Sequence, residues 1–165
     1  MRLPTFVALL WACTPVAAQN APPPPPDWGP WASLVGSWVA EGQTSGQPGE
    51  ATAGGFTIEY QLDKRILVRR NFAEYPNYRH DDLAVMTPGH ATYWDNEGHV
   101  IEYATEVLDE GRTLRWVSEP SAQAPRFRFT YKRLSPDRLG VIFEIAPPGQ
   151  PDAFKVYTQA TVRRK

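Results

Sequence analysis

The sequence has one cysteine, Cys13, among its 165 residues. One thiol cannot close an intrachain disulfide, and it excludes zinc sites that use two or more thiolates. Small exported domains often compensate for a limited core with disulfides. A folded unit in this chain must therefore be stabilised by burial of apolar surface.

An excess of either charge is also absent, because 17 basic residues face 18 acidic ones and the net charge is −1. A nucleic-acid partner or an anionic membrane surface requires a basic footprint. The three basic residues 163–165 are interpreted as a solvated terminus. We therefore expect no nucleic-acid partner.

Long apolar runs are confined to the first 18 residues. Arg2 precedes the mostly apolar residues 3–13, and small residues stand at positions 16–18, an order typical of a secretory signal peptide. The run is shorter than the about 20 residues that cross a bilayer, so we do not expect a transmembrane protein. We predict cleavage after Ala18 and export to the periplasm or the medium. The alternative is a lipoprotein signal that leaves Cys13 lipid-anchored.

A run of five prolines at residues 22–26 follows the predicted signal peptide. Such a run forms a stiff polyproline helix without a core. We therefore expect a proline-rich spacer over residues 19–27 and one folded domain over residues 28–165. That domain is large enough for a single sizeable core.

An apolar repeat of helical period is missing after residue 18, and two-residue alternation takes its place. Residues 126–132 show it best, with Phe127, Phe129 and Tyr131 on one face and polar residues on the other. Similar strand candidates are residues 56–60, 66–72, 114–117, 141–145 and 154–162.

Turn-forming residues separate these candidates and predict antiparallel hairpins. They stand at residues 95–98, 109–111, 135–138 and 147–152. We predict an all-β fold, an antiparallel up-and-down β-barrel of about 8–10 strands, because closure removes exposed strand edges. Residues 42–55 are expected to form a long first loop and residues 75–82 an irregular, lid-like segment.

The segment at residues 34–42, which contains Gly36 and Trp38, resembles the opening strand of the calycin superfamily. It is most similar to the lipocalin-like bacterial secreted proteins of unknown function that begin with Leu-x-Gly-x-Trp. Residues 64–72 and 93–98 resemble later strands of the same group.

This resemblance implies that Trp38 plugs one end of the barrel and that Gly36 allows close backbone approach there. It also implies an arginine stacked on the tryptophan, for which Arg163 and Arg133 are the candidates. The nitrobindin-like branch binds haem through a histidine late in the chain. No histidine follows His99 here, so we expect no haem and no other cofactor.

The three histidines, His80, His90 and His99, are nine or ten residues apart, which does not match the tighter pairs of zinc sites. We therefore predict no metal site. Residues 80–82 are interpreted as a solvated loop. His90 and His99 flank one predicted hairpin, where they could face each other as metal ligands or a general base, although surface pairing is the preferred interpretation. Neither a nucleophile elbow nor a phosphate-binding loop is present, and we assign no catalytic residue.

A barrel of about eight strands either holds one small ligand or is filled by its own side chains. The candidate ligand-binding residues are Arg70, Trp94, Glu102, Trp116, Phe129 and Tyr131. Arg70 shares strand parity with Val68 and Phe72, and a buried arginine needs an anionic partner. Glu102, Glu144 or a ligand carboxylate could serve. A register shifted by one residue would instead turn Leu67 and Arg69 inward.

These observations favour an exported calycin-like barrel that binds a small hydrophobic or organic-acid ligand. An enzyme of the same shape, an isomerase or hydrolase that uses His90, His99 or Glu102, is the first alternative. A structural envelope protein with a filled barrel is the second. The sequence does not specify the oligomeric state.

Overall fold

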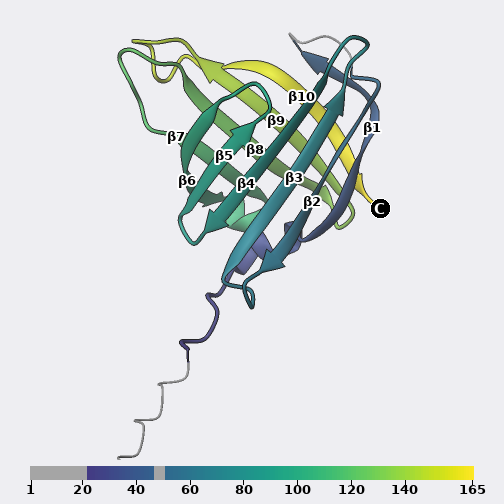
Figure 1. Cartoon of the computed structure of the whole chain (residues 1–165), viewed down its shortest axis with the longest axis vertical. Coiled ribbons are helices and arrows are strands. Elements are labelled where there is room, and N and C mark those ends of the chain that lie inside the picture. The colour runs from purple at the N-terminus through teal and green to yellow at the C-terminus, as the bar shows by residue number, and fades with distance from the viewer. Residues whose placement is uncertain (1–21, 47–50) are drawn as a thin grey trace, which may run out of the picture.

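The computed structural model describes residues 22–46 and 51–165, and the predicted signal peptide and Cys13 lie outside them. In the described residues, ten antiparallel strands close into one barrel in which chain neighbours pair and β1 pairs with β10 (Figure 1). The predicted all-β, up-and-down architecture is confirmed.

The strands follow one another with short connections. Their bounds are β1 (Gly36–Gly46), β2 (Ala53–Gln61), β3 (Ile66–Glu74), β4 (Arg79–Thr87), β5 (His90–Asp95), β6 (Val100–Leu108), β7 (Thr113–Ser118), β8 (Arg126–Ser135), β9 (Arg138–Ala146) and β10 (Lys155–Arg164). Two short 3-10 helices, η1 (Gly29–Leu34) and η2 (Asp109–Gly111), accompany them. No helix of the described residues is long and apolar enough to cross a membrane.

Two segments are more regular than the sequence predicts. The long first loop expected at residues 42–55 is shorter, because β1 continues to Gly46 across a register shift and β2 begins at Ala53. The segment expected to be irregular at residues 75–82 is a tight turn followed by a strand. β4 begins at Arg79, and this first residue pairs with Glu74, the last residue of β3. Its polar composition conceals the strand because part of the barrel interior is itself polar.

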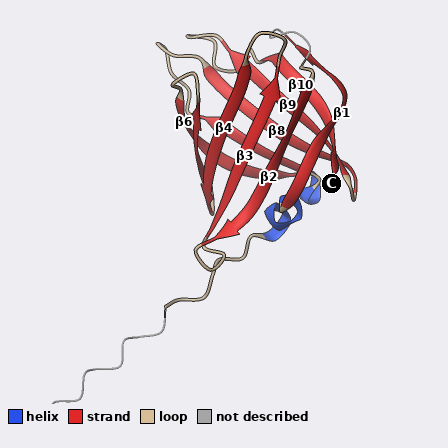
Figure 2. Ribbon diagram, turned by 45° about the vertical axis from the view of Figure 1, so that its right-hand side comes forward, coloured by secondary structure: helices blue, strands red, loops and turns tan. Residues whose placement is uncertain are grey.

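One end of the barrel is closed by η1, which lies across the opening (Figure 2). Trp31 and Leu34 of this helix are buried, and the Trp38 side chain above them is only 2% exposed. Trp38 Nε1 donates a hydrogen bond to the Leu34 carbonyl oxygen at 2.9 Å. The indole therefore packs at the closed end with its one polar atom satisfied.

The arginine stacked on Trp38 is Arg164, and the sequence-based candidates Arg163 and Arg133 were wrong. The Arg164 guanidinium carbon lies 4.4 Å from the Trp38 ring centre. In the β1–β10 ladder Trp38 pairs with Arg164, whereas Arg163 pairs with Val39 and is exposed on the outer face. Strand parity thus selects Arg164, because alternate residues point to opposite faces.

Gly36 provides the space for this arginine. A Cβ at this position would lie 2.5 Å from Arg164 Nη1, and the backbone φ of Gly36 is +132°. L-residues with a side chain rarely adopt that conformation. Glycine therefore satisfies both the backbone geometry and the close approach of the guanidinium.

The hydrophobic core fills the half of the barrel that adjoins η1. Its largest buried members are Trp28, Trp31, Leu34, Trp38, Phe56, Ile58, Leu67, Met86, Tyr103, Leu114, Trp116 and Tyr131. These side chains come from both halves of the sequence, so closure of the ladder is what brings them together. The half nearer the opposite end is not filled in this way.

Candidate functional site

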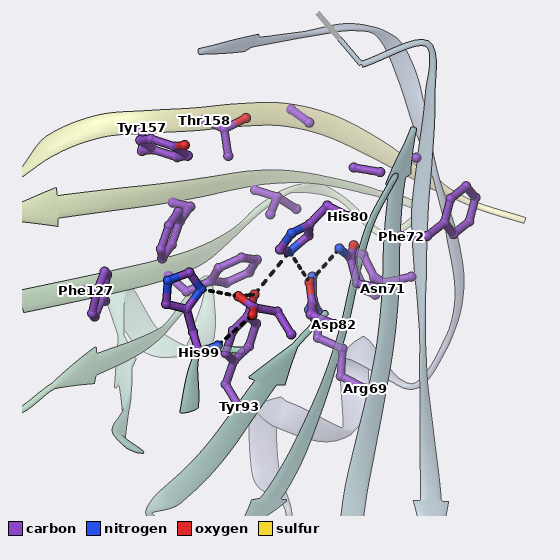
Figure 3. A pocket seen from close by; sticks show the side chains of 18 of the residues that line it. Arg69, Asn71, Phe72, His80, Asp82, Tyr93, His99, Phe127, Tyr157 and Thr158 are labelled. Carbon is purple, nitrogen blue, oxygen red and sulfur yellow. Dashed lines mark hydrogen bonds and ion pairs between the residues drawn. The ribbon is translucent and has the colours of Figure 1, made fainter. Parts of the chain in front are cut away.

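A cavity of about 350 Å³ occupies the barrel at the end opposite η1. The β3–β4 connection contributes Tyr75 and Tyr78 to the lining at the cavity mouth, the β5–β6 connection contributes His99, and the beginning of β10 contributes Tyr157. Figure 3 shows the side chains that surround it. The charged side chains of this lining come from β3, β4, β5 and the β5–β6 connection, and a group of aromatic rings comes from β8, β9 and β10.

The apolar wall comes from β8, β9 and β10. The Phe127 and Phe143 rings are stacked at 6.0 Å with an interplanar angle of 6°, and Tyr157 meets Phe143 edge-on at 5.9 Å. Phe129 lies deeper, 6.1 Å from Phe143. This wall offers flat aromatic surface to a ligand.

The polar wall comes from β3, β4 and β5, and its innermost element is a buried ion pair between Arg69 and Asp82. The side chains of these two residues are 2% and 4% exposed. Asp82 also accepts a hydrogen bond of 2.7 Å from Asn71 Nδ2 and lies 3.3 Å from His80 Nε2. The Asp82 carboxylate therefore joins three lining residues.

Arg69 is held over aromatic rings as well as against Asp82. Its guanidinium carbon is 4.9 Å from the Phe129 ring centre and 5.3 Å from that of Phe56, which is cation–π geometry. Burial alone lowers the pKa of Arg69, but the Asp82 carboxylate outweighs it and the net shift is upward. Arg69 is therefore a permanent cation beneath the cavity.

His80 extends the network towards the mouth. Its Nδ1 lies 2.9 Å from Glu97 Oε1, and its Nε2 lies 3.1 Å from the Tyr93 hydroxyl. The hydrogen bond to Asp82, opposed by burial and assisted by Glu97, raises the pKa of His80 to about 9. The imidazole is therefore protonated at neutral pH, and both ring nitrogens are engaged.

Tyr93 connects this network to a second carboxylate, Asp95. The Tyr93 hydroxyl donates to Asp95 Oδ2 at 3.3 Å, and the same oxygen lies 2.9 Å from His99 Nδ1. Asp95 Oδ1 accepts the backbone N–H groups of Glu97 and His99 at 3.0 and 2.9 Å. Burial opposes ionisation, but the backbone and ring hydrogen bonds from His99 hold the pKa of Asp95 below its usual value.

The polar wall is therefore a chain of hydrogen bonds in which each charge has a partner. Arg69 and protonated His80 supply two positive charges, and Asp82, Asp95 and Glu97 supply three negative ones. Because both cations are paired and the carboxylates are in excess, the wall offers hydrogen bonds and no net attraction for an anion.

Three of the sequence-predicted site residues lie inside the barrel. Phe129 lines the cavity. Trp116 and Tyr131 lie beneath it, with ring centres 5.5 and 5.0 Å from that of Phe129, and both are about 1% exposed. They support the wall and do not line the cavity themselves.

The other three, Arg70, Trp94 and Glu102, lie on the outer surface, so their expected inward placement was wrong. Arg70 is exposed because β3 adopts the alternative register with Leu67 and Arg69 inward. Trp94 and Glu102 point outward because alternate residues of a strand face opposite sides, and their neighbours Tyr93 and Tyr103 face the interior.

Glu102 and Glu144, which the sequence suggested as partners of a buried arginine, also lie on the outer surface of the barrel. Glu102 accepts a hydrogen bond from Thr92 and lies 2.5 Å from His90 Nε2, and Glu144 pairs with Arg128 through two bonds of 2.7 Å. The buried arginine is Arg69, and its partner is Asp82.

Sequence reasoning missed the residues of the polar wall. The interpretation of residues 80–82 as a solvated loop was wrong, because His80 and Asp82 point into the cavity from β4. The available signal was the alternation of His80, Asp82, Ala84 and Met86. His90 and His99 do not face each other, since His90 pairs with Glu102 on the outer surface and His99 lines the cavity mouth. Among the described residues, no group of three or more His, Cys, Asp or Glu side chains is arranged to hold a metal ion.

Comparisons with known proteins support the fold and not a family. No family model matches the chain, and no curated protein matches it. Among solved structures, the crystal structure of Rv2717c from M. tuberculosis superposes with a TM-score of 0.56, covering 82% of this chain and 94% of that one. The two sequences are 14% identical, so the chain shares a barrel fold with that protein and the likeness carries no function.

Proposed function

We propose that this chain is a calycin-like binding protein that takes one small, predominantly apolar ligand with a hydrogen-bonding end into the barrel. The observation that carries the proposal is a cavity of about 350 Å³ with an aromatic wall facing a polar one. Small-molecule sites are concave, mostly apolar and equipped with a few oriented polar groups, at volumes of about 300–1,000 Å³. An unfilled cavity of this size disfavours the filled structural barrel.

The two walls suggest how a ligand lies. A flat apolar body fits against Phe127, Phe143 and Tyr157, and a polar end then meets Asn71 and Tyr93 on the other side. A ligand carboxylate would have to compete with Asp82 for Arg69 and His80, because both cations are already paired. We therefore favour a neutral polar group over the organic acid that the sequence also suggested.

A matched series of probes tests this proposal. Naphthalene, 2-naphthol, 2-naphthoic acid and dodecanoic acid would be compared by thermal unfolding and by quenching of tryptophan fluorescence. Trp116 is a suitable reporter because its ring contacts Phe129 of the cavity wall. We expect 2-naphthol to raise the melting temperature most, since ligand that binds only the native state stabilises it. A larger shift with 2-naphthoic or dodecanoic acid would favour an acidic ligand.

A cavity-filling variant provides the control. Ala160 lines the cavity from β10, so Ala160→Phe should abolish the shift. Val156, on the same strand, is 45% exposed and does not line the cavity, so Val156→Phe should leave the shift intact. Equal binding by both variants, or no binding by the wild type, would contradict the proposal.

We also propose that the barrel acts after export, on the basis of the signal-like first 18 residues. Intact-mass measurement of the protein from its native host tests this point. A mass that begins at Gln19 supports cleavage after Ala18, whereas an acylated mass that begins at Cys13 supports the lipid-anchored alternative. The uncleaved mass would contradict both.

A further inference from the structure

We infer that Asp95 and His99 form a general-base site, at which His99 Nε2 takes a proton from a water molecule that attacks a small aryl ester held in the cavity. This activity goes beyond ligand binding and rests on the proposed cavity, because the ester must be bound there. From the sequence, His99 was named only together with His90 and Glu102, as residues that an alternative isomerase or hydrolase could use.

The first support is the rigid orientation of the pair. Asp95 is 4% exposed at its side chain, and its two oxygens accept two backbone N–H groups, the Tyr93 hydroxyl and His99 Nδ1. An ionised carboxylate at 2.9 Å requires the proton of neutral His99 to be on Nδ1. The lone pair of the ring is then on Nε2, as a general base needs.

The second support is that this nitrogen is available beside the cavity. His99 lines the cavity mouth, its side chain is 57% exposed, and its Nε2 has no hydrogen-bond partner among residues 22–46 and 51–165. The other two histidines differ. Both nitrogens of His80 are engaged, and Nε2 of His90 is bound to Glu102 on the outer surface.

The third support is the hydrogen-bond chain that holds Asp95 in place. Tyr93 donates to Asp95 from one side and lies 3.1 Å from protonated His80 on the other. The positive charge that develops on His99 when it accepts a proton lies next to the buried Asp95 carboxylate, which stabilises it. Asp95 and Tyr93 are positioning residues, and only His99 contacts the reacting water.

The reaction balances without a cofactor. As water attacks the acyl carbon, a C–O bond forms and one water proton moves to His99 Nε2. The tetrahedral intermediate then collapses, the C–O bond to the aryl oxygen breaks, and the proton moves from the imidazolium to that oxygen. The products are a carboxylic acid and a phenol, and His99 returns to its neutral form. An aryl leaving group matches the wall of Phe127 and Phe143.

The test substrate is 4-nitrophenyl acetate, whose product is coloured. We expect saturable hydrolysis by the wild type and a loss of about 100-fold in kcat for His99→Gln, in the range of general-base contributions. The matched control is His90→Gln, which removes a histidine–carboxylate pair on the outer surface of the barrel and should leave kcat unchanged. Asp95→Asn should lower kcat with little change in KM.

Chemical rescue separates catalysis from a structural role. His99→Gly should regain saturable hydrolysis when imidazole is added, at a rate above that of imidazole and substrate without protein, because the free base fills the vacated position. A merely structural defect would give only the protein-free rate. Equal rates for His99→Gln and wild type, with 2-naphthol still raising the melting temperature of both, would overturn the general-base inference and leave the binding proposal standing. If neither protein binds 2-naphthol nor shows saturation, both proposals fail.

Discussion

The Arg164 guanidinium lies 4.4 Å from the Trp38 ring centre and also donates hydrogen bonds to the carbonyl oxygens of Val35 and Ser33, at 2.7 and 2.9 Å. One side chain of the last strand therefore holds the first strand and the C-terminal end of η1. The seam between β1 and β10 is where a ten-stranded meander must close. This contact joins residues separated by about the whole length of the barrel sequence.

Replacing Arg164 with alanine should destabilise the barrel by about 2 kcal/mol. A cation–π contact contributes about 0.5–2 kcal/mol, and the two carbonyl groups lose a charged donor. The free energy of unfolding from urea titration measures this loss. Arg163→Ala is the control, since Arg163 is exposed on the outer face, and a change within about 0.5 kcal/mol is expected there. Equal effects of the two substitutions would contradict the assigned closure.

Replacing Trp38 with alanine should cost about 3–5 kcal/mol, as large core truncations do. Trp38 is 2% exposed and is stacked 6.0 Å from Phe56. Trp94→Ala removes an equally large ring that is 38% exposed on the outside and should cost much less. Chemical denaturation of both variants checks the difference, and similar losses would show that Trp38 does not have the structural role described.

The two adjacent arginines of β3 should respond very differently to alanine. Arg69→Ala leaves the Asp82 carboxylate buried without its closest cation, which costs about 3–5 kcal/mol for a buried ion pair. His80 and Asn71 remain next to Asp82, so we expect about 3 kcal/mol. Arg70→Ala on the exposed face should change the unfolding free energy by less than about 0.5 kcal/mol. The reverse ranking would mean that the register of β3 is shifted by one residue.

Stability should fall as the pH rises through the range in which His80 loses its proton. The pKa of His80 is raised to about 9 in the folded protein, against about 6.5 in an unfolded chain. A raised folded pKa adds stability that is fully present below about pH 6.5 and is lost as the pH rises through about 9. Histidine NMR titration gives the pKa, and urea titrations from pH 6 to 10 give the stability.

Two variants isolate the contribution of His80. In His80→Gln the part of the pH slope due to the imidazole should disappear, so the difference between wild type and variant shrinks towards pH 10. Asp82→Asn replaces the carboxylate whose hydrogen bond is the main cause of the raised pKa of His80, so the His80 midpoint should move down. A His80 midpoint near 6.5 in the wild type would contradict the network as described.

Sequence reasoning succeeded where local pattern and local chemistry agree. Phe127, Phe129 and Tyr131 alternate with polar residues, and only one face of β8 can be apolar. The turn residues at positions 95–98 and 135–138 connect neighbouring antiparallel strands, as predicted. These features depend on two-residue periodicity and on turn geometry, which are properties of short segments.

The polar side of the cavity could not be predicted in the same way. Ile66, Leu67 and Val68 are consecutive apolar residues, so β3 lacks the alternation that would show which of its faces points inward. The local sequence therefore does not distinguish Arg69 from Arg70 as the inward arginine. The pairing of Arg69 with Ala84 and of Asn71 with Asp82 resolves the ambiguity. A polar stretch such as residues 79–82 resembles a loop until the neighbouring strand supplies its partners.

The amino-acid sequence by itself determined an all-β chain of consecutive hairpins with an aromatic interior face, because alternation and turn propensity act over a few residues. Tertiary structure alone decided which arginine is buried, which arginine covers Trp38, and which histidine lies at the cavity mouth beside Asp95. Each of those outcomes depends on the register of strands around a closed barrel. In a closed ladder the inward face of one strand depends on pairing with its neighbours, and no single segment contains that information.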